Sequence, residues 1–140
     1  MGRPEMNELV IDAKVENLDV ILDHLAGYLE KLQCPAKIQV QLAIAVEEIF
    51  VNIAHYAYDS GKTGQVQINF ETENDSSISI CFTDWGIPYN PLAKEDPDVT
   101  LSAEERKIGG LGIYMVKKSM DNVFYRYEEG KNILVIEKTY

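Results

Sequence analysis

The sequence predicts an α+β sandwich in which helices cover one face of a largely antiparallel sheet. Two observations predict this fold class. The expected elements follow the order β-α-α-ββ-loop-α-ββ, which clusters the strands together. The paired strands alternate apolar and polar residues, a pattern typical of a sheet with one buried face. With 140 residues, of which 46% are hydrophobic and 26% charged, the chain has the size and composition of one globular domain spanning residues 1–140.

The first half of the chain is expected to supply one strand and two helices. Residues 7–13 form a short, mainly apolar segment that predicts an opening strand. From Val15 to about Lys31, apolar residues recur with the period of a helix that has a polar opposite face. Pro35 suits the first turn of a second helix, whose apolar stripe predicts that it continues to about Tyr56.

The second half of the chain is expected to form two hairpins separated by a long loop and a helix. Apolar and polar residues alternate in residues 66–70 and again in residues 78–82, which predicts an antiparallel hairpin. The periodicity is then lost in residues 84–108, and a loop of this length in a compact domain usually carries function. A third helix at about residues 110–121 and a closing hairpin within residues 123–137 complete the chain.

The composition excludes several classes of partner. The 13 Lys and Arg residues against 23 Asp and Glu residues give a formal net charge of −10, which repels nucleic-acid backbones and anionic lipid. The sequence has no run of 18 apolar residues, and no apolar segment of a signal peptide follows its first residues. Cys34 and Cys81 lie far apart without metal-ligand spacing, so we expect reduced thiols. We therefore expect a cytoplasmic protein that binds neither nucleic acid nor membrane directly.

The predicted second helix carries Glu48 and Asn52 four residues apart and therefore on one face. On a helical wheel this pair falls at the border of the apolar stripe, whereas Glu47 points to the solvated side. Asn52 offers a neutral carbonyl oxygen suited to Mg²⁺, and Glu48 could accept a proton from a hydroxyl group or a water. Taken alone, the pair is better explained as a solvated helix face with an incidental asparagine.

Asp84 and Gly86 come directly after the second strand of the first hairpin. An ionised aspartate only accepts hydrogen bonds, so at the end of a strand Asp84 suits an exocyclic amine such as that of adenine. Gly86 would allow the backbone to approach a flat ring closely. An ordinary strand-terminating turn is the alternative explanation, and in isolation it is the better one.

Glycines gather where the long loop meets the third helix, at Gly109, Gly110 and Gly112 around Leu111. Glycines at a helix start expose backbone N–H groups to an anion, and the helix dipole favours the same charge. No Gly-Lys-Ser/Thr follows, so the segment is not a P-loop, and a loop precedes it where a dinucleotide-binding fingerprint needs a strand. A flexible hinge explains these glycines about as well as an anion site.

Together, the three groups resemble the N, G1 and G2 boxes of the gyrase, chaperone and histidine-kinase ATPase superfamily (GHKL). In particular, the chain resembles the stand-alone anti-sigma-factor serine/threonine kinase family of bacteria. The matching segments are VEEIFVNIAHYAY (46–58), DWGIPYNPL (84–92) and RKIGGLGIYMVKKSMDNVFYRYEEGKNILVIEK (106–138). The resemblance covers nearly the whole chain, and it implies the two-layer α/β sandwich of the GHKL (Bergerat) ATP-binding fold.

The resemblance also implies a role for each group in using ATP and Mg²⁺. Glu48 would be the general base that activates the attacking hydroxyl, and Asn52 would coordinate the Mg²⁺ that bridges the phosphates. Asp84 would receive the adenine amine, with Gly86 beside the ring. Residues from about 92 to 108 would form a lid over the phosphates. The other residues implied to bind ATP are Arg106, Lys107, Gly109, Gly110, Leu111 and Gly112.

The partners implied by the resemblance are two proteins and a second copy of the chain. The family's substrate is a Ser or Thr of a small anti-anti-sigma protein, its other partner is a sigma factor that it holds inactive, and a homodimer is expected. The first helix here is acidic, with Asp19 and Asp23 and no Lys or Arg before Lys31. If binding of the sigma factor relies on basic groups in this helix, this chain lacks them. The alternative is a nucleotide-gated protein-binding module of the same fold without kinase activity; simple ATP hydrolysis is the least expected.

Overall fold

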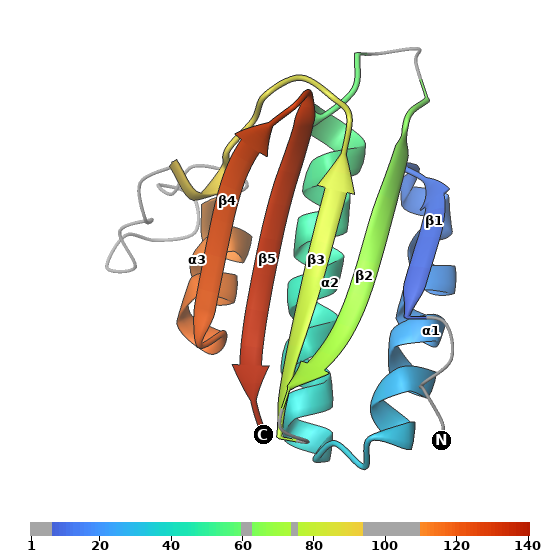
Figure 1. Cartoon of the computed structure of the whole chain (residues 1–140), viewed down its shortest axis with the longest axis vertical. Coiled ribbons are helices and arrows are strands. Elements are labelled where there is room, and N and C mark those ends of the chain that lie inside the picture. The colour runs from blue at the N-terminus through green and yellow to red at the C-terminus, as the bar shows by residue number, and fades with distance from the viewer. Residues whose placement is uncertain (1–6, 60–62, 74–75, 94–109) are drawn as a thin grey trace.

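Residues 7–59, 63–73, 76–93 and 110–140 are described by the computed structural model of the chain (Figure 1). They form a five-stranded sheet with the strand order β1-β2-β3-β5-β4, in which every neighbouring pair is antiparallel. The α-helices of the described residues all lie against one face of this sheet (Figure 1). The predicted α+β sandwich is therefore confirmed.

The elements of the first half agree closely with the sequence pattern. The opening strand is β1 (Glu8–Asp12), and a 3₁₀ turn at Val15–Asn17 leads into α1 (Leu18–Lys31). The long apolar helix is α2 (Ala36–Tyr56). Pro35 has an extended backbone with ψ 143° and precedes the first helical residue, one position outside the turn in which it was expected.

The second half forms the two predicted hairpins, and the strands are longer than the alternation alone indicated. The first hairpin is β2 (Gln65–Glu73) and β3 (Ser77–Asp84); a 3₁₀ turn at Pro91–Ala93 and α3 (Gly110–Ser119) follow; the closing hairpin is β4 (Asn122–Glu128) and β5 (Lys131–Thr139). Glu129 and Gly130 join β4 to β5 with φ angles of 53° and 78°. Two consecutive positive φ angles are typical of a type I′ turn, whose twist matches a hairpin.

The core lies between the sheet and the helix layer. Every second residue of β3 is buried, and the buried set is Ile78, Ile80, Phe82 and Asp84. Burying each of the three apolar side chains stabilises the fold by about 1.5–3 kcal/mol. Asp84 is the last residue of β3 and is in phase with these buried residues. The alternation therefore places its carboxylate on the face of the sheet that the helices cover, at the end of the strand.

Helix α2 is the central helix of the layer, and it packs against α1 and α3. Among the described residues it is also the one helix whose length and apolar composition would allow it to cross a membrane. Core helices meet the same criterion, and Leu42, Val46, Ile49 and Phe50 of α2 are buried against the sheet. The criterion is therefore weak evidence for a membrane span.

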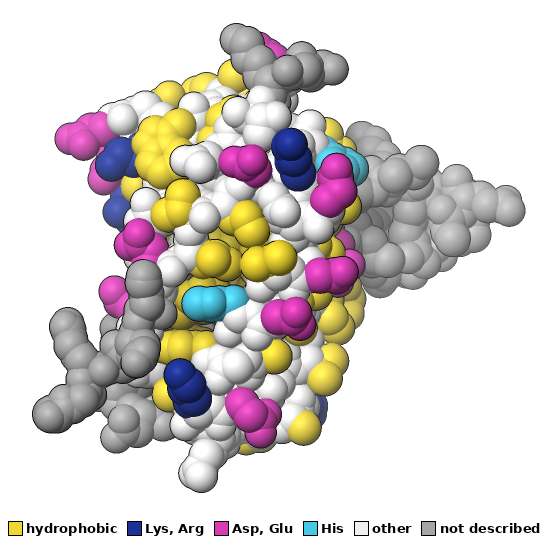
Figure 2. All heavy atoms as spheres, turned by 90° about the vertical axis from the view of Figure 1, so that its right-hand side faces the viewer, with side chains coloured by type: hydrophobic (Ala, Val, Ile, Leu, Met, Phe, Trp, Pro, Cys, Tyr) yellow, Lys and Arg dark blue, Asp and Glu magenta, His cyan; other side chains and the backbone are white. Residues whose placement is uncertain are grey.

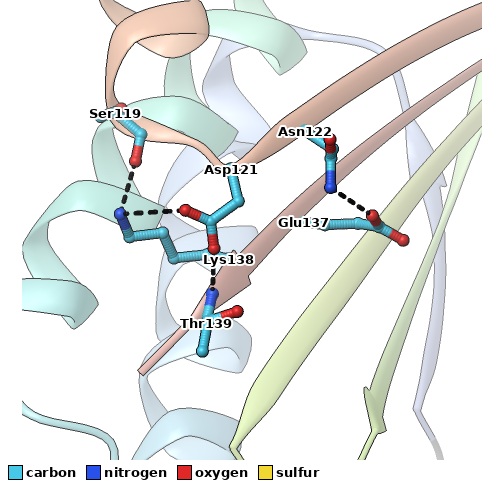
Figure 3. A network of polar contacts seen from close by, with 6 residues as sticks. All are labelled: Ser119, Asp121, Asn122, Glu137, Lys138 and Thr139. Carbon is cyan, nitrogen blue, oxygen red and sulfur yellow. Dashed lines mark hydrogen bonds and ion pairs between the residues drawn. The ribbon is translucent and has the colours of Figure 1, made fainter.

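A group of polar contacts ties the end of α3 to β5 (Figure 3). The ammonium of Lys138 donates to the carbonyl of Ser119, the last residue of α3, at 2.8 Å and lies 3.9 Å from a carboxylate oxygen of Asp121. Asp121 also accepts the backbone N–H of Thr139 at 2.7 Å. We call Ser119, Asp121, Lys138 and Thr139 the α3 clamp, because they satisfy a free carbonyl at the helix end and hold it on the sheet.

The side of the molecule formed by β1 and α1 is acidic. Figure 2 shows acidic side chains spread over this side, with apolar side chains between them. On α1, Asp19, Asp23 and Glu30 are exposed, and so is Val20 with 50% of its surface accessible. The acidic character that the sequence indicated for this helix is thus presented to the outside.

Candidate functional site

Three buried polar side chains come together between α2 and the end of the sheet. Asn52, Asp84 and Asn132 are 8%, 4% and 5% exposed, and they are the buried polar residues of the described part of the chain. They belong to α2, β3 and β5, and all three line one pocket with a cavity volume of about 30 Å³. The rest of its wall comprises Ile49, Ile53, Ala57, Phe82, Tyr89, Pro91, Tyr125 and Leu134. Because buried polar groups destabilise a fold unless they are hydrogen-bonded, their gathering in one pocket makes it the candidate functional site.

Asp84 is held by hydrogen bonds to only one of its two carboxylate oxygens. Oδ1 accepts the backbone N–H of Gly86 and the side-chain amide of Asn132, both at 2.9 Å. Oδ2 accepts no hydrogen bond from the residues that the structure describes. Burial raises the pKa of Asp84, and the two hydrogen bonds oppose that rise. The second oxygen is therefore an acceptor available to a ligand, as the adenine hypothesis requires.

Asn52 and Glu48 lie one turn apart on α2, as predicted. The amide nitrogen of Asn52 donates to the backbone carbonyl of Glu48 at 2.8 Å, which fixes the side chain along the helix. Its Oδ1 accepts no hydrogen bond from any described residue. Glu47 is exposed and points to the solvated side, whereas Glu48 is half-buried. The helical wheel thus placed all three side chains correctly.

Glu48 lies against the first turn of α3. A Cβ atom added to Gly112, the third residue of that helix, would overlap the Glu48 carboxylate. The absence of a side chain at Gly112 is therefore what allows the carboxylate to reach the N-terminal turn of α3. Burial raises the pKa of Glu48, and the nearby charge of Glu47 raises it further. A carboxylate with a raised pKa is a stronger base, which suits proton transfer near neutral pH.

Gly86 has a structural reason to be a glycine that the sequence did not indicate. A Cβ atom at this position would overlap the carbonyl of Ala57, at the end of α2. The neighbouring N–H of Ile87 donates to that same carbonyl at 2.8 Å. The close approach of Gly86 to α2 therefore holds the loop after β3 on the helix; its expected place beside an adenine ring stays a prediction.

Sequence reasoning missed Asn132 and two tyrosines of the pocket. Tyr89 stacks on Tyr56 with ring centroids 5.4 Å apart, and Tyr125 donates from its hydroxyl to Asn132. Asn132 shares the inward face of β5 with Leu134 and Ile136, so a polar residue in phase with an apolar alternation was the available signal. It was overlooked because the strand was expected to begin only at residue 133.

Part of the predicted site lies outside the described residues. Arg106, Lys107 and Gly109 belong to that part, as does the expected lid from residue 94 onward. Gly110 and Leu111 are the first two residues of α3 in the described backbone, which confirms the expected start of the third helix at about residue 110. The structure therefore brings together Glu48, Asn52, Asp84, Gly86 and Gly112.

Comparison with known proteins gives consistent results for the sequence and the structure. The family model of the histidine kinase-like ATPase domain matches residues 11–138. The chain is 28% identical over 139 residues to the serine-protein kinase RsbW of Bacillus cereus (strain Q1) and 27% identical to that of Bacillus mycoides (strain KBAB4), covering 96% of this chain and 86% of each relative. In fold it is similar to the RsbU and RsbW domains of Rv1364c from Mycobacterium tuberculosis, with a TM-score of 0.64 and 13% identity. That alignment covers 98% of this chain and 33% of the larger one.

Proposed function

The chain belongs to the histidine kinase-like ATPase domain family, and on this premise we propose that it is a cytoplasmic protein serine/threonine kinase. It binds ATP with Mg²⁺ and phosphorylates a Ser or Thr of an anti-anti-sigma protein, while it sequesters a sigma factor. One observation carries the proposal: Asn52, Asp84 and Asn132 are buried around one pocket. Glu48, one turn from Asn52 on α2, lies against Gly112 of α3.

Asp84 is the residue that recognises the base. Its free oxygen accepts an N–H bond, which the exocyclic amine of adenine offers and the corresponding carbonyl of guanine does not. The cavity of about 30 Å³ is far smaller than the roughly 300–1,000 Å³ of pockets that enclose ligands of this size. Nucleotide binding therefore requires side chains of the wall to move.

Asn52 fits a role in holding Mg²⁺. Its nitrogen is used within α2, so its oxygen is the free atom of the amide. Mg²⁺ prefers oxygen ligands, keeps several waters and is commonly held by one or two protein groups together with substrate phosphates. In keeping with this, the described residues contain no cluster of three or more His, Cys, Asp or Glu that would enclose a metal by themselves. The bound ion would neutralise charge on the phosphates.

Glu48 acts as the general base. The hydroxyl oxygen of the partner's Ser or Thr forms a bond to the γ-phosphorus, the bond from that phosphorus to the ADP oxygen breaks, and Glu48 takes the hydroxyl proton. The backbone N–H groups at the start of α3 support the phosphate charge, in line with the helix dipole. Phosphoryl transfer depends mainly on positioning and charge stabilisation, so a carboxylate set beside this helix end is what the reaction requires.

The kinase activity is supported by the relatives, whose name is serine-protein kinase RsbW, and the two partner proteins are those implied by the resemblance to the anti-sigma-factor kinase family. The acidic side formed by β1 and α1 would suit a partner surface that carries Lys and Arg residues (Figure 2). A homodimer is also part of the proposal. It is taken from the resemblance to the kinase family.

The first test is calorimetric titration of the purified protein with ATP and ADP, with and without Mg²⁺. We expect binding that strengthens with Mg²⁺ and a clear preference for ATP over GTP. Lack of binding at millimolar nucleotide, or equal affinity for ATP and GTP, would contradict the assignment of the pocket.

The kinase step is tested with Glu48→Ala. We expect this variant to bind ATP as the wild type does and to lose phosphoryl transfer to the anti-anti-sigma partner by at least about 100-fold. The exposed neighbour Glu47 provides the matched control, since Glu47→Ala should retain the transfer rate. If wild-type protein binds ATP without transferring phosphate, the nucleotide-gated binding module becomes the better account.

A further inference from the structure

Asn132 lies at the start of β5, directly opposite Asp84 in the register between β3 and β5. Its side chain faces the helix layer, is 5% exposed and lines the same pocket as Asp84. A buried amide lowers stability unless its donors and acceptor are satisfied. The partners of Asn132 therefore indicate what this residue holds in place.

Every hydrogen-bonding position of the Asn132 amide has a partner. Its nitrogen donates to Oδ1 of Asp84 at 2.9 Å and to the backbone carbonyl of Ile87 at 2.8 Å. Its oxygen accepts the backbone N–H of Tyr89 at 3.1 Å and the hydroxyl of Tyr125. Asn132 thus links the carboxylate, the loop after β3 and the neighbouring strand β4.

The backbone partners determine which way the amide is turned. The carbonyl of Ile87 can only accept, and the N–H of Tyr89 can only donate. Exchanging the nitrogen and oxygen of Asn132 would place acceptor against acceptor and donor against donor. Both N–H bonds of Asn132 are consequently committed inside the protein, so this residue acts on a ligand through Asp84.

The effect of Asn132 on Asp84 is to divide the two carboxylate oxygens between protein and pocket. Oδ1 accepts from Asn132 and from the N–H of Gly86, which fixes the plane of the carboxylate. Oδ2 is left without a donor among the described residues. Donation from Asn132 also lowers the pKa of Asp84 against the rise caused by burial, which favours the ionised form that can only accept.

We propose that Asn132 is the positioning residue that makes this pocket selective for a purine with a 6-amino group. It holds Asp84 so that one carboxylate oxygen is used by the protein and the other faces the base. The inference rests on the proposed binding of ATP and deepens it, because it assigns the selectivity to the pair Asp84–Asn132 where the sequence indicated Asp84 alone.

The test compares ADP with purine riboside diphosphate, which lacks only the 6-amino group, by calorimetric titration of wild-type protein and Asn132→Ala. We expect the variant to bind ADP about 10–100-fold more weakly, the usual effect of losing a hydrogen bond to a charged group. Its affinity for purine riboside diphosphate should fall by less than about threefold, because that base offers Asp84 no N–H. The selectivity for ADP should therefore collapse.

A double variant adds a second readout. Asp84→Asn should remove the same selectivity, and adding Asn132→Ala to it should reduce ADP affinity by less than about threefold further, since both changes remove one interaction. Independent, multiplicative losses would contradict an action of Asn132 through Asp84. Asn122→Ala, at the opposite end of the same hairpin, is the control and should keep full selectivity.

The outcomes separate this inference from the proposed function. If wild-type protein binds neither nucleotide, the proposed function fails and the inference fails with it. If wild-type protein prefers ADP and Asn132→Ala weakens both nucleotides equally, Asn132 is only structural and this inference alone is wrong. Should Asn132→Ala not fold, Asn132→Ser is tested in its place, because its hydroxyl retains one donor. We expect Asn132→Ser to have a selectivity for ADP between those of wild type and Asp84→Asn. An unchanged selectivity would overturn the inference.

Discussion

The two ends of the sheet each carry an aspartate that accepts a backbone N–H, and the two aspartates behave in opposite ways. At one end, Asp84 is 4% exposed and burial raises its pKa. At the other end, Asp121 belongs to the α3 clamp (Figure 3), and the backbone N–H of Thr139, with help from Lys138, lowers its pKa. Burial therefore disfavours the ionised carboxylate of Asp84 at one end, whereas hydrogen bonding favours the ionised carboxylate of Asp121 at the other.

The difference shows how burial distinguishes Asp84, the proposed binding group, from Asp121, which has a structural role. Asp121 has both oxygens engaged by β5 and the solvent around it, so its charge contributes to holding α3. Asp84 is kept in a buried place with one oxygen unused by the described residues, an arrangement that weakens the fold unless a ligand completes it. Locally unfavourable groups of this kind are common at sites that bind or react, where stability is given up for function.

The largest effect is expected for Gly112→Ala, in the first turn of α3. A new Cβ atom would push the Glu48 carboxylate aside, because that carboxylate is the flexible end of a side chain. We expect phosphoryl transfer to the partner to fall by about 100-fold, as is typical for a catalytic group displaced by about 1 Å. Gly27→Ala is the control: nothing lies within 4 Å of that position in α1, so the change should stabilise the protein by about 0.5–1 kcal/mol. An unchanged transfer rate in Gly112→Ala would contradict the role of Glu48.

Gly86→Ala is expected to act on stability. The added Cβ atom would meet the carbonyl of Ala57, which is backbone and cannot turn away as a side chain can. We expect a loss of about 1–3 kcal/mol in the free energy of unfolding, measured with urea. A fully stable Gly86→Ala protein would show that the loop after β3 is not fastened to α2 as the structure has it.

Asp84→Asn is expected to stabilise the protein while it weakens nucleotide binding. Because the folded state raises the pKa of Asp84, it binds the proton more tightly than the unfolded state, and stability falls as the pH rises through the folded-state pKa. The uncharged variant avoids this loss, so we expect a gain of about 1 kcal/mol at pH 7 that disappears in acid. Urea unfolding at pH 7 and pH 4 measures this gain. A variant less stable than the wild type at pH 7 would contradict the conclusion that the buried charge of Asp84 lowers stability.

Asp121→Asn should give the smallest effect and the opposite sign. A lowered pKa means that the ionised form stabilises the fold above the pKa of the unfolded state and ceases to do so as the pH falls through the folded-state pKa. This exposed site should lose less than about 1 kcal/mol at neutral pH and nothing in acid, with nucleotide affinity unchanged. The exposed pair Arg126–Glu128 offers a control in Glu128→Gln, which should not alter stability. An altered nucleotide affinity in Asp121→Asn would mean that the two ends are coupled.

Much of the fold could be predicted from the sequence, because its signals are local. The alternation in β3 predicted which side chains face the helices, and it did so up to Asp84. The spacing of Glu48 and Asn52 predicted their common face on α2. Each of these conclusions depends on the period of a helix or strand, which neighbouring residues determine among themselves.

Asn132 could not be predicted in the same way. Its importance arises from Asp84 and Ile87, which are 48 and 45 positions away in the chain. The strand order that sets β5 beside β3 is a property of the whole sheet. Likewise, nothing near Gly112 in the sequence indicates that Glu48, from another helix, occupies the space beside it.

By itself the sequence therefore determined the elements, the buried face of each and the three groups of residues that resemble a nucleotide site. Only the tertiary structure decided that Asp84 shares its buried position with Asn132, and that Glu48 reaches α3 through the space left at Gly112. The physical reason is that helical and strand periods are short-range, whereas burial and hydrogen bonding depend on which distant elements the packed sheet and helices bring into contact.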